Sequence, residues 1–354
     1  MRIAILGDCH IGARNESPVV MEYQLKFFEE VFIPFLKKNR INTVLQTGDL
    51  FDKRKYTSHS ILHVWKRRVF DVLQKMKVEF HVVVGNHDAA FSNTVSVNSP
   101  SLLLSNYENI IVYSEPTEVM FDKTPVLMVP WVCKDNEKPC LEAIKESTSF
   151  YCMGHFELGG FEMQKGTVID SGLDKSKLDR FCQVWSGHYH TRSNDGRIYY
   201  LGTPYELTWA DYNDQRGFYT FDTSTLDFDF HKNPHVLFNK IHYNDSIGTS
   251  KGYHKGFDLS GLENTYVKVI VTKKTDAYEF DALMDKMYKM NIADIKIIDD
   301  FNDDATEVDD DDVELGDTMT LANTYIDSSA LDLDKPKLKS LMLSLHVEAL
   351  SFEG

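Results

Sequence analysis

Short apolar runs that end in a glycine followed by polar residues recur along the first 230 residues of the chain. Runs of four to six apolar residues bounded by glycine are typical of buried strands. The sequence therefore predicts strands within 2–10, 43–52, 80–88, 150–157 and 183–190.

Two segments between these runs, 20–38 and 59–77, carry apolar residues at helical spacing. Strands that alternate with helices predict a layered α/β domain. Two later runs, 197–204 and 217–223, have less helical sequence between them. We expect these two runs to form a second, antiparallel sheet.

The pattern changes near residue 235, so we place the end of the first domain there. The stretch 242–264 is rich in Gly, Ser, Asn and His and is typical of a loop. A strand, a helix and a strand are predicted at 267–274, 277–291 and 294–300. This unit, within 236–298, is small for an independent domain, and we expect it to cap the first domain.

Charge divides the rest of the chain. Lys and Arg number 38 and Asp and Glu 54, a formal net charge of −16. Eleven of these acids lie in 299–317, which has no Lys or Arg and is predicted to be a disordered linker. Without that linker the net charge no longer argues against a nucleic-acid partner.

Two short apolar helices are predicted in 318–354, beyond the acidic linker. Apolar helices after a tether commonly dock in a partner's groove, and folding back on the capping unit is the alternative. The residues predicted to bind a partner are Leu338, Leu341, Met342 and Leu345.

Composition narrows the class of protein. Hydrophobic residues make up 42% and charged residues 26%, which excludes a mostly disordered or collagen-like chain. No apolar run approaches the roughly 18 residues of a membrane helix. The five cysteines include no C-x-x-C pair, and we expect mostly buried thiols in a reducing cytoplasm.

Ligand-type side chains follow each of the five predicted strands. Side chains just past the carboxyl ends of strands converge on one edge of such a domain. The candidate metal ligands are Asp8, His10, Asp49, Asn86, His155, His188 and His190. Imidazole with carboxylate and amide oxygen suits divalent manganese, iron or zinc, and two ions sharing a carboxylate would need about seven such ligands.

A single Gly-Asp or Gly-His-x-His is weak evidence for a metal site, because either is common in turns and strand edges. Five such elements in order, each ending an apolar run, are far less easily explained by chance. Cys9 lies between two candidate ligands, and we expect its side chain to point into the core rather than act in catalysis.

The motifs GDCHIG, GDLFD, GNHD, GHFE and GHYH resemble those of the calcineurin-like metallophosphoesterases. With YLGTPYELTWADYNDQRGFYTFD and the appended tail, the chain is most similar to the SbcD branch of recombination nucleases, in particular to its T-even bacteriophage members. The resemblance implies a four-layer α/β/β/α sandwich with a small capping domain that binds DNA. It also implies two divalent ions, above all Mn²⁺ with Mg²⁺ as the alternative, a homodimer, and an SbcC-type coiled-coil ATPase bound by the C-terminal helices.

The resemblance also assigns roles to the candidate residues. Asp8, His10 and His190 would hold the first ion, Asn86, His155 and His188 the second, and Asp49 would bridge them. His87 would assist phosphodiester cleavage, with Asp88 orienting its ring. The cellular members usually carry a histidine where this chain has Asp52, which leaves substrate handling at that position open.

Basic residues close to these motifs are candidates for DNA contact. Lys53, Arg54 and Lys55 directly follow the Asp49 motif. A second cluster at 66–68 is equally well explained as a solvated helix face. The helix 59–77 is also a candidate dimer interface, because Ile61, Leu62, Trp65 and Val69 exceed what a solvated helix needs; core packing is the competing explanation.

The leading interpretation is a metal-dependent DNA nuclease subunit that degrades duplex ends and cleaves single strands together with the ATPase. One alternative is a phosphomonoesterase or cyclic-nucleotide phosphodiesterase of the same superfamily, against which the capping unit and tail argue. The other is a non-catalytic scaffold, against which the complete ligand set and His87 argue.

Overall fold

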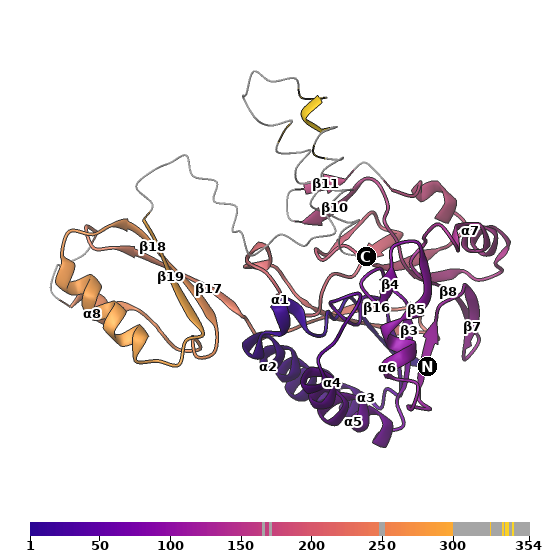
Figure 1. Ribbon diagram of the computed structural model, residues 1–354. Coiled ribbons are helices and arrows are strands. Elements are labelled where there is room, and N and C mark those ends of the chain that lie inside the picture. The colour runs from indigo at the N-terminus through magenta and orange to yellow at the C-terminus, as the bar shows by residue number, and fades with distance from the viewer. Residues whose placement is uncertain are drawn as a thin grey trace. The chain divides into compact units, whose positions relative to one another are not determined.

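The computed structural model describes residues 1–164, 167–169, 172–247 and 252–299, together with Ile326, Lys335, 337–339 and Met342. The chain divides into two units, Met1–Phe301 and Asn302–Gly354. Every described strand belongs to the first unit (Figure 1).

The first sheet has six strands and is mixed. β1, β2, β3 and β6 run parallel, while β15 pairs antiparallel with β1 and β16 antiparallel with β15. In spatial order the strands are β16 (Phe228–Lys232), β15 (Gly217–Asp222), β1 (Arg2–Leu6), β2 (Thr43–Gln46), β3 (Glu79–Val83) and β6 (Ile110–Tyr113).

The second sheet also has six strands and is mixed. β14, β12, β9 and β8 are parallel, and β13 and β7 are antiparallel strands at its two edges. Its order is β13 (Ser193–Asn194), β14 (Ile198–Tyr200), β12 (Gln183–Gly187), β9 (Tyr151–His155), β8 (Thr124–Val129) and β7 (Thr117–Phe121).

Three apolar clusters separate four layers. Ile3 of β1 and Trp185 of β12 belong to the cluster between the two sheets. The next residue along β1, Ala4, belongs to the cluster beneath the helices of the first sheet. Val184, the neighbour of Trp185, shares a third cluster with Ile144 of α7 (Glu137–Glu146). Successive strand residues point to opposite faces, so both sheets are buried on both sides, and the expected α/β/β/α order is confirmed.

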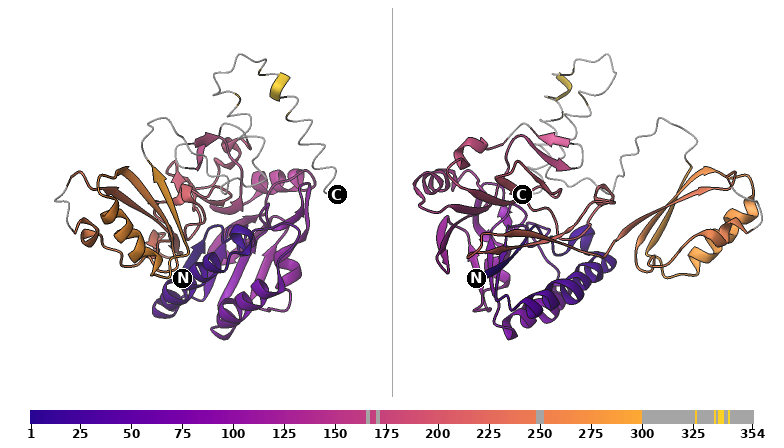
Figure 2. Two further views of the ribbon diagram at one scale, coloured as in Figure 1. Left: turned by 60° about the vertical axis from the view of Figure 1, so that its left-hand side comes forward. Right: turned by 180° about the vertical axis from the view of Figure 1, so that it is seen from behind.

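Two helical rods cover the outer face of the first sheet and lie side by side (Figures 1 and 2). The first is α2 (Pro18–Lys26), a π-helical turn (Phe27–Phe32) and α3 (Ile33–Asn39). The second is α4 (His59–Trp65), a π-helical turn (Lys66–Phe70) and α5 (Asp71–Lys75). Phe28 of the first rod packs edge-to-face on Trp65 of the second, with ring centroids 5.3 Å apart.

Core packing accounts for the apolar face of the second rod. Ile61, Trp65 and Val69 are at most 4% exposed and belong to the cluster against the first sheet, with Leu62 half-buried beside them. These residues therefore give no argument for a dimer interface.

The five predicted strands that precede ligand motifs are confirmed as β1, β2, β3, β9 and β12. The expectation of a separate antiparallel sheet from 197–204 and 217–223 is wrong. β14 joins the second sheet parallel to β12, and β15 joins the first sheet antiparallel to β1. An apolar run predicts a buried strand, but its neighbour is decided by long-range packing.

A third sheet forms the end of the first unit. It contains three parallel strands, β17 (Phe238–Asn244), β18 (Tyr266–Lys273) and β19 (Asp294–Asp299), and α8 (Ala277–Tyr288) lies against one face (Figure 1). Val269 and Leu283 are fully buried in a cluster that this sheet and helix share. The predicted strand–helix–strand unit is confirmed but incomplete, because β17 begins before, and overlaps, the segment predicted as a loop.

Shorter elements connect these layers. They are the left-handed turn labelled α1 (Ala13–Glu16), α6 (Ser99–Leu103), the hairpins β4 (Ala89–Phe91) with β5 (Thr94–Asn98) and β10 (Phe161–Gln164) with β11 (Thr167–Ile169), and 3₁₀ turns at Lys175–Leu178, Trp209–Asp211 and Tyr253–Gly256. The described helices include none long and apolar enough to span a bilayer.

Most of the tail lies outside the described residues. That holds for the acidic segment 300–317 and for Leu341 and Leu345. Leu338 and Met342 are helical and half-buried. The cysteines are as expected, with Cys9, Cys133, Cys140 and Cys152 buried and Cys182 exposed, and none of them in a disulfide.

Candidate metal centre

The candidate ligands lie at the carboxyl ends of five parallel strands. Asp8 and His10 follow β1, Asp49 follows β2 and Asn86 follows β3 in the first sheet, and His155 ends β9 in the second. His188 and His190 follow β12, beside β9. Since the two sheets face each other, these ends meet at one edge of the sandwich.

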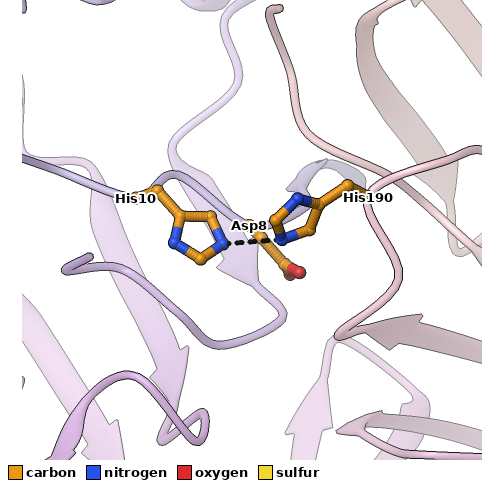
Figure 3. A group of neighbouring side chains, drawn as sticks. All are labelled: Asp8, His10 and His190. Atoms are coloured by element: carbon orange, nitrogen blue, oxygen red, sulfur yellow. Dashed lines mark hydrogen bonds between the residues drawn. The ribbon is translucent and has the colours of Figure 1, made fainter. Parts of the chain in front are cut away.

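Asp8, His10 and His190 form the first group. One ligand atom from each lies within 4.8 Å of the other two. The Nε2 atoms of His10 and His190 face each other at 2.9 Å, and Figure 3 shows both rings turned toward one another beside the Asp8 carboxylate. The carboxylate is fully buried and accepts the amide of His188 at 2.8 Å. Two ring nitrogens and a buried carboxylate that converge in this way fit a divalent cation.

Asp49, His155 and His188 form the second group. Asn86 joins it, because its Oδ1 lies 2.7 Å from Nε2 of His155 and 3.0 Å from Nδ1 of His188. The other ring nitrogen of His155 lies 2.9 Å from the carbonyl of Thr47, which directs Nε2 toward the group.

Asp49 lies between the two groups. Its Oδ2 is 3.2 Å from Nε2 of His155 and 3.9 Å from Nε2 of His10. Its Oδ1 accepts the main-chain amide of His87 at 2.8 Å, which fixes the plane of the carboxylate. The position is the one that a carboxylate shared by two ions would need.

The backbone is strained where it presents these ligands. His10, Asp49 and His188 have positive φ angles of 46°, 52° and 90°. Such conformations are uncommon for residues other than glycine and persist where the surrounding structure holds them. Gly85 contributes space, because a Cβ there would lie 2.1 Å from Oδ1 of Asp49.

The electrostatics of the centre favour a cation. Burial raises the pKa of Asp8 to about 7. Burial would also raise the pKa of Asp49, but His155 beside it lowers that pKa well below its usual range. Burial alone would lower the pKa of His155, but the charge of Asp49 outweighs it and raises that pKa to about 9. Burial lowers the pKa of His188 to about 3. A cation here would replace the proton on His155 and neutralise both carboxylates.

His87 lies next to the first group, but its ring contacts a different residue from Asp88, which was expected to orient it. Its Nδ1 is 2.6 Å from the main-chain carbonyl of Asp52. Asp88, the residue expected to orient the ring, uses its carboxylate to accept the amides of Leu50, Phe51 and Gly85 at 2.9–3.2 Å. Asp88 therefore fixes the chain that carries Asp52, and acts on His87 through that chain.

Three further residues lie beside the candidate ligands and were not among the predicted site residues. Glu157 Oε2 lies 3.9 Å from Nε2 of His188, and Arg216 donates to the carbonyl of His190. The carbonyl of Thr47 has no sequence signal, because every residue carries one. Glu157 could have been predicted from the sequence, because it lies two residues after the candidate ligand His155. Cys9 is fully buried, as expected.

The basic residues after the Asp49 motif differ from one another. Lys53 donates to Asn15 and Tyr56, and Lys55 is exposed. Burial lowers the pKa of Arg54 and the nearby charge of Asp49 opposes that shift, so Arg54 lies within electrostatic reach of the centre.

The second basic cluster is a paired helix face. Arg68 binds Glu22 and Glu29 of the neighbouring rod at 2.7 Å each. Lys66 lies 3.4 Å from Asn106. The contacts favour the interpretation of 66–68 as a helix surface rather than a phosphate-binding site.

Comparison with known proteins agrees with this arrangement. A family model described as calcineurin-like phosphoesterase matches residues 1–271. The chain is 33% identical over 352 residues to "Exonuclease subunit 1" of Enterobacteria phage T4, and the match covers 99% of both proteins.

Two solved structures match weakly. An archaeal phosphodiesterase is 12% identical with a TM-score of 0.33 over 66% of this chain and all of its own. A glutamine-dependent NAD⁺ synthetase from Acinetobacter baumannii, in complex with ADP, is 10% identical with a TM-score of 0.30 over 98% and 72% of the two chains. Neither bears on the site. The family match and the relative that spans nearly the whole chain confirm the resemblance, and the chain belongs to the calcineurin-like phosphoesterase family.

Proposed function

We propose that this chain is the nuclease subunit of a DNA recombination and double-strand break processing complex. It would degrade duplex ends as an exonuclease and cleave single strands as an endonuclease. The observation that carries the proposal is the convergence of two buried ligand groups on Asp49, with His87 beside them. The relative named as an exonuclease subunit supports DNA as the substrate.

The ligand groups would hold two divalent ions, Mn²⁺ above all. Asp8, His10 and His190 would bind one, Asn86, His155 and His188 the other, and Asp49 both. Two such ions activate a water and neutralise charge that develops on a phosphate. The chain itself keeps the ligands in place through buried main-chain contacts, such as that of Thr47 to His155.

His87 would act on the leaving oxygen. Because a carbonyl accepts only, the contact with Asp52 requires the hydrogen of His87 to lie on Nδ1. Nε2 is then the atom that holds or moves a proton at the substrate. The half-buried ring lies 5.0 Å, centroid to centroid, from that of His10, at the edge of the first ligand group.

Three lysines support a DNA-binding role for 236–298. Lys240, Lys268 and Lys296 lie in register across β17, β18 and β19. They alternate with the residues that pack on α8, so they share the opposite face. Nζ of Lys268 lies 4.3 Å from the ring centroid of Trp209, and Nζ of Lys240 lies 4.6 Å from that of Tyr212. A row of like charges beside aromatic rings is typical of nucleic-acid surfaces. Arg54, with Lys53 and Lys55, is the candidate contact nearer the centre.

We also propose that the tail binds an SbcC-type ATPase and that the chain forms a homodimer. Apolar helical residues such as Leu338 and Met342 support the first part. Leu341→Asp should abolish pull-down of the ATPase without lowering the stability of the isolated chain. Undiminished pull-down with a destabilised chain would favour folding back. Light scattering of the full chain tests the dimer.

The decisive experiment uses linear duplex DNA and circular single-stranded DNA with Mn²⁺, with and without the ATPase. Wild type should cleave, Asp49→Ala should be inactive, and His87→Ser should retain Mn²⁺ binding but lose about 10²- to 10⁴-fold in rate. His63→Ser, at an exposed histidine on α4, is the matched control. An absence of metal-dependent DNA cleavage in every condition would sink the nuclease proposal, and hydrolysis of simple phosphomonoesters instead would favour the phosphomonoesterase alternative.

A further inference from the structure

Asp52 contacts two residues of the proposed centre through two different groups. Its carboxylate joins His10 and His87 in a third cluster, in which one ligand-type atom from each lies within 4.8 Å of the others. The side chain is 16% exposed. No motif marks Asp52 as a ligand, and the two groups described above do not use it.

The carboxylate faces His10. Oδ1 of Asp52 lies 3.3 Å from Nδ1 of His10, while Nε2 of the same ring points at His190. A histidine that binds a metal through one nitrogen almost always donates the hydrogen on its other nitrogen to a carboxylate, a carbonyl or water. Asp52 lies on that side of the ring at ion-pair distance rather than in hydrogen-bond geometry, and a rotation of its carboxylate would bring an oxygen into line to accept that hydrogen. It would hold the ring in the tautomer that leaves Nε2 available to an ion.

The main-chain carbonyl faces His87. It lies 2.6 Å from Nδ1 of that ring, and this contact does not involve the side chain at position 52. The amide of Asp52 is bonded to the carbonyl of Ile11 at 3.0 Å. The two preceding amides, of Leu50 and Phe51, are held by Asp88. The carbonyl therefore follows three consecutive anchored amides.

We propose that Asp52 is a positioning residue with two separable tasks. Its carboxylate sets the tautomer and orientation of His10 for the first ion, and its carbonyl sets those of His87. The first task rests on the proposed two-ion centre. Neither task depends on DNA as the substrate.

Calorimetric titration of the metal-stripped full chain with Mn²⁺ tests the first task. Asp52→Ala should weaken binding of one of the two ions by about 10- to 100-fold and leave the other unchanged. Asp52→Asn keeps an acceptor oxygen, so its Mn²⁺ affinity should fall less than that of Asp52→Ala. Asp281→Asn, at an exposed position on α8, should bind both ions as wild type does. Wild-type Mn²⁺ affinity in Asp52→Ala, with the fold checked by circular dichroism, overturns this part.

Nitrogen NMR of the histidine-labelled, metal-free chain tests the second task. The ring of His87, assigned by its loss in His87→Ser, should carry hydrogen on Nδ1 in wild type and equally in Asp52→Ala. The tautomer of His10 should be uniform in wild type and mixed in Asp52→Ala. A His87 ring protonated on Nε2 alone in wild type, or one that changes in Asp52→Ala, overturns the assignment. Both readouts are made without DNA, so they are separate from any failure of the nuclease proposal.

Discussion

The carboxylate of Asp8 occupies the space that a side chain at Gly187 would need. A Cβ on Gly187 would lie 2.2 Å from Oδ1 of Asp8 and 2.7 Å from the carbonyl of Thr47. The last residue of β12 thus leaves room for the candidate ligand that follows β1 in the other sheet. The glycine of the GHYH motif is therefore required by packing.

Gly187→Ala should displace Asp8 and weaken Mn²⁺ binding by on the order of 10- to 100-fold, because the first ligand group loses its carboxylate geometry. Overpacking should also lower the free energy of unfolding by about 1–3 kcal/mol. Mn²⁺ titration and urea denaturation measure the two effects. Gly256→Ala is the control, since a Cβ there meets nothing within 4 Å; equal behaviour of the two variants would contradict the prediction.

Arg216 connects the candidate ligand His190 to a buried acid. Its guanidinium, 2% exposed, donates to the carbonyl of His190 and lies 2.6 Å from Asp211, itself 6% exposed. Arg216→Ala leaves the acid buried and unpaired, and should cost about 3–5 kcal/mol in urea denaturation. Arg197→Ala removes an equally short contact, to the exposed Asp179, and should cost less than about 1 kcal/mol. If both variants lost similar free energy of unfolding, burial of the ion pair would not be the cause of the loss in Arg216→Ala.

Local sequence was enough to predict which candidate ligands lie together, and the reason is geometric. Each motif follows its own strand, and the carboxyl ends of parallel strands meet at one edge. Asp8, Asp49 and His155 could therefore be grouped before any pairing was known. The roles of the Asp52 and Thr47 carbonyls could not, because a main-chain group has no sequence signal.

The local pattern of apolar residues also could not predict which distant strands pair with one another. β15 is antiparallel to β1 because its register with Arg2–Leu6 buries Phe221 between the sheets, a choice made across more than 200 residues. β17 was missed because half of its residues, such as Lys240 and His242, are polar and point away from α8. The sequence of a strand that packs on only one face carries as many polar as apolar residues, so by itself it resembles the sequence of a loop.

Glu206 makes stability depend on pH at the start of β17. Its carboxylate, 3% exposed, accepts the amides of Leu237 and Phe238 at 2.6 and 3.0 Å. Burial raises its pKa from 4.5 to about 7, and Asp211 adds to the rise while Arg216 opposes it. Because the folded state keeps this proton longer than the unfolded state, stability should fall as the pH rises from about 4.5 to about 7.

Glu206→Gln removes this dependence. The difference in unfolding free energy between wild type and the variant should change by at most about 3 kcal/mol across that window and stay constant above it. Thermal denaturation at a series of pH values measures it. Glu263→Gln, at an exposed glutamate, should keep the wild-type profile. A Glu206→Gln profile parallel to that of wild type from pH 4 to 8 would refute the assignment.

The salt dependence of DNA binding tests the role of Lys240, Lys268 and Lys296 separately from any effect on the stability of the fold. Changing all three to Gln should weaken binding of duplex DNA and reduce the slope of log K against log salt by about 3, one for each lost phosphate contact. The free energy of unfolding is measured alongside, because each lost contact with Trp209 or Tyr212 should cost about 0.5–1 kcal/mol, which relief of like-charge repulsion partly offsets. Fluorescence anisotropy at several salt concentrations measures the slope. Lys289→Gln, exposed just beyond α8, should leave it unchanged. An unaltered slope in the triple variant would place the DNA on another surface.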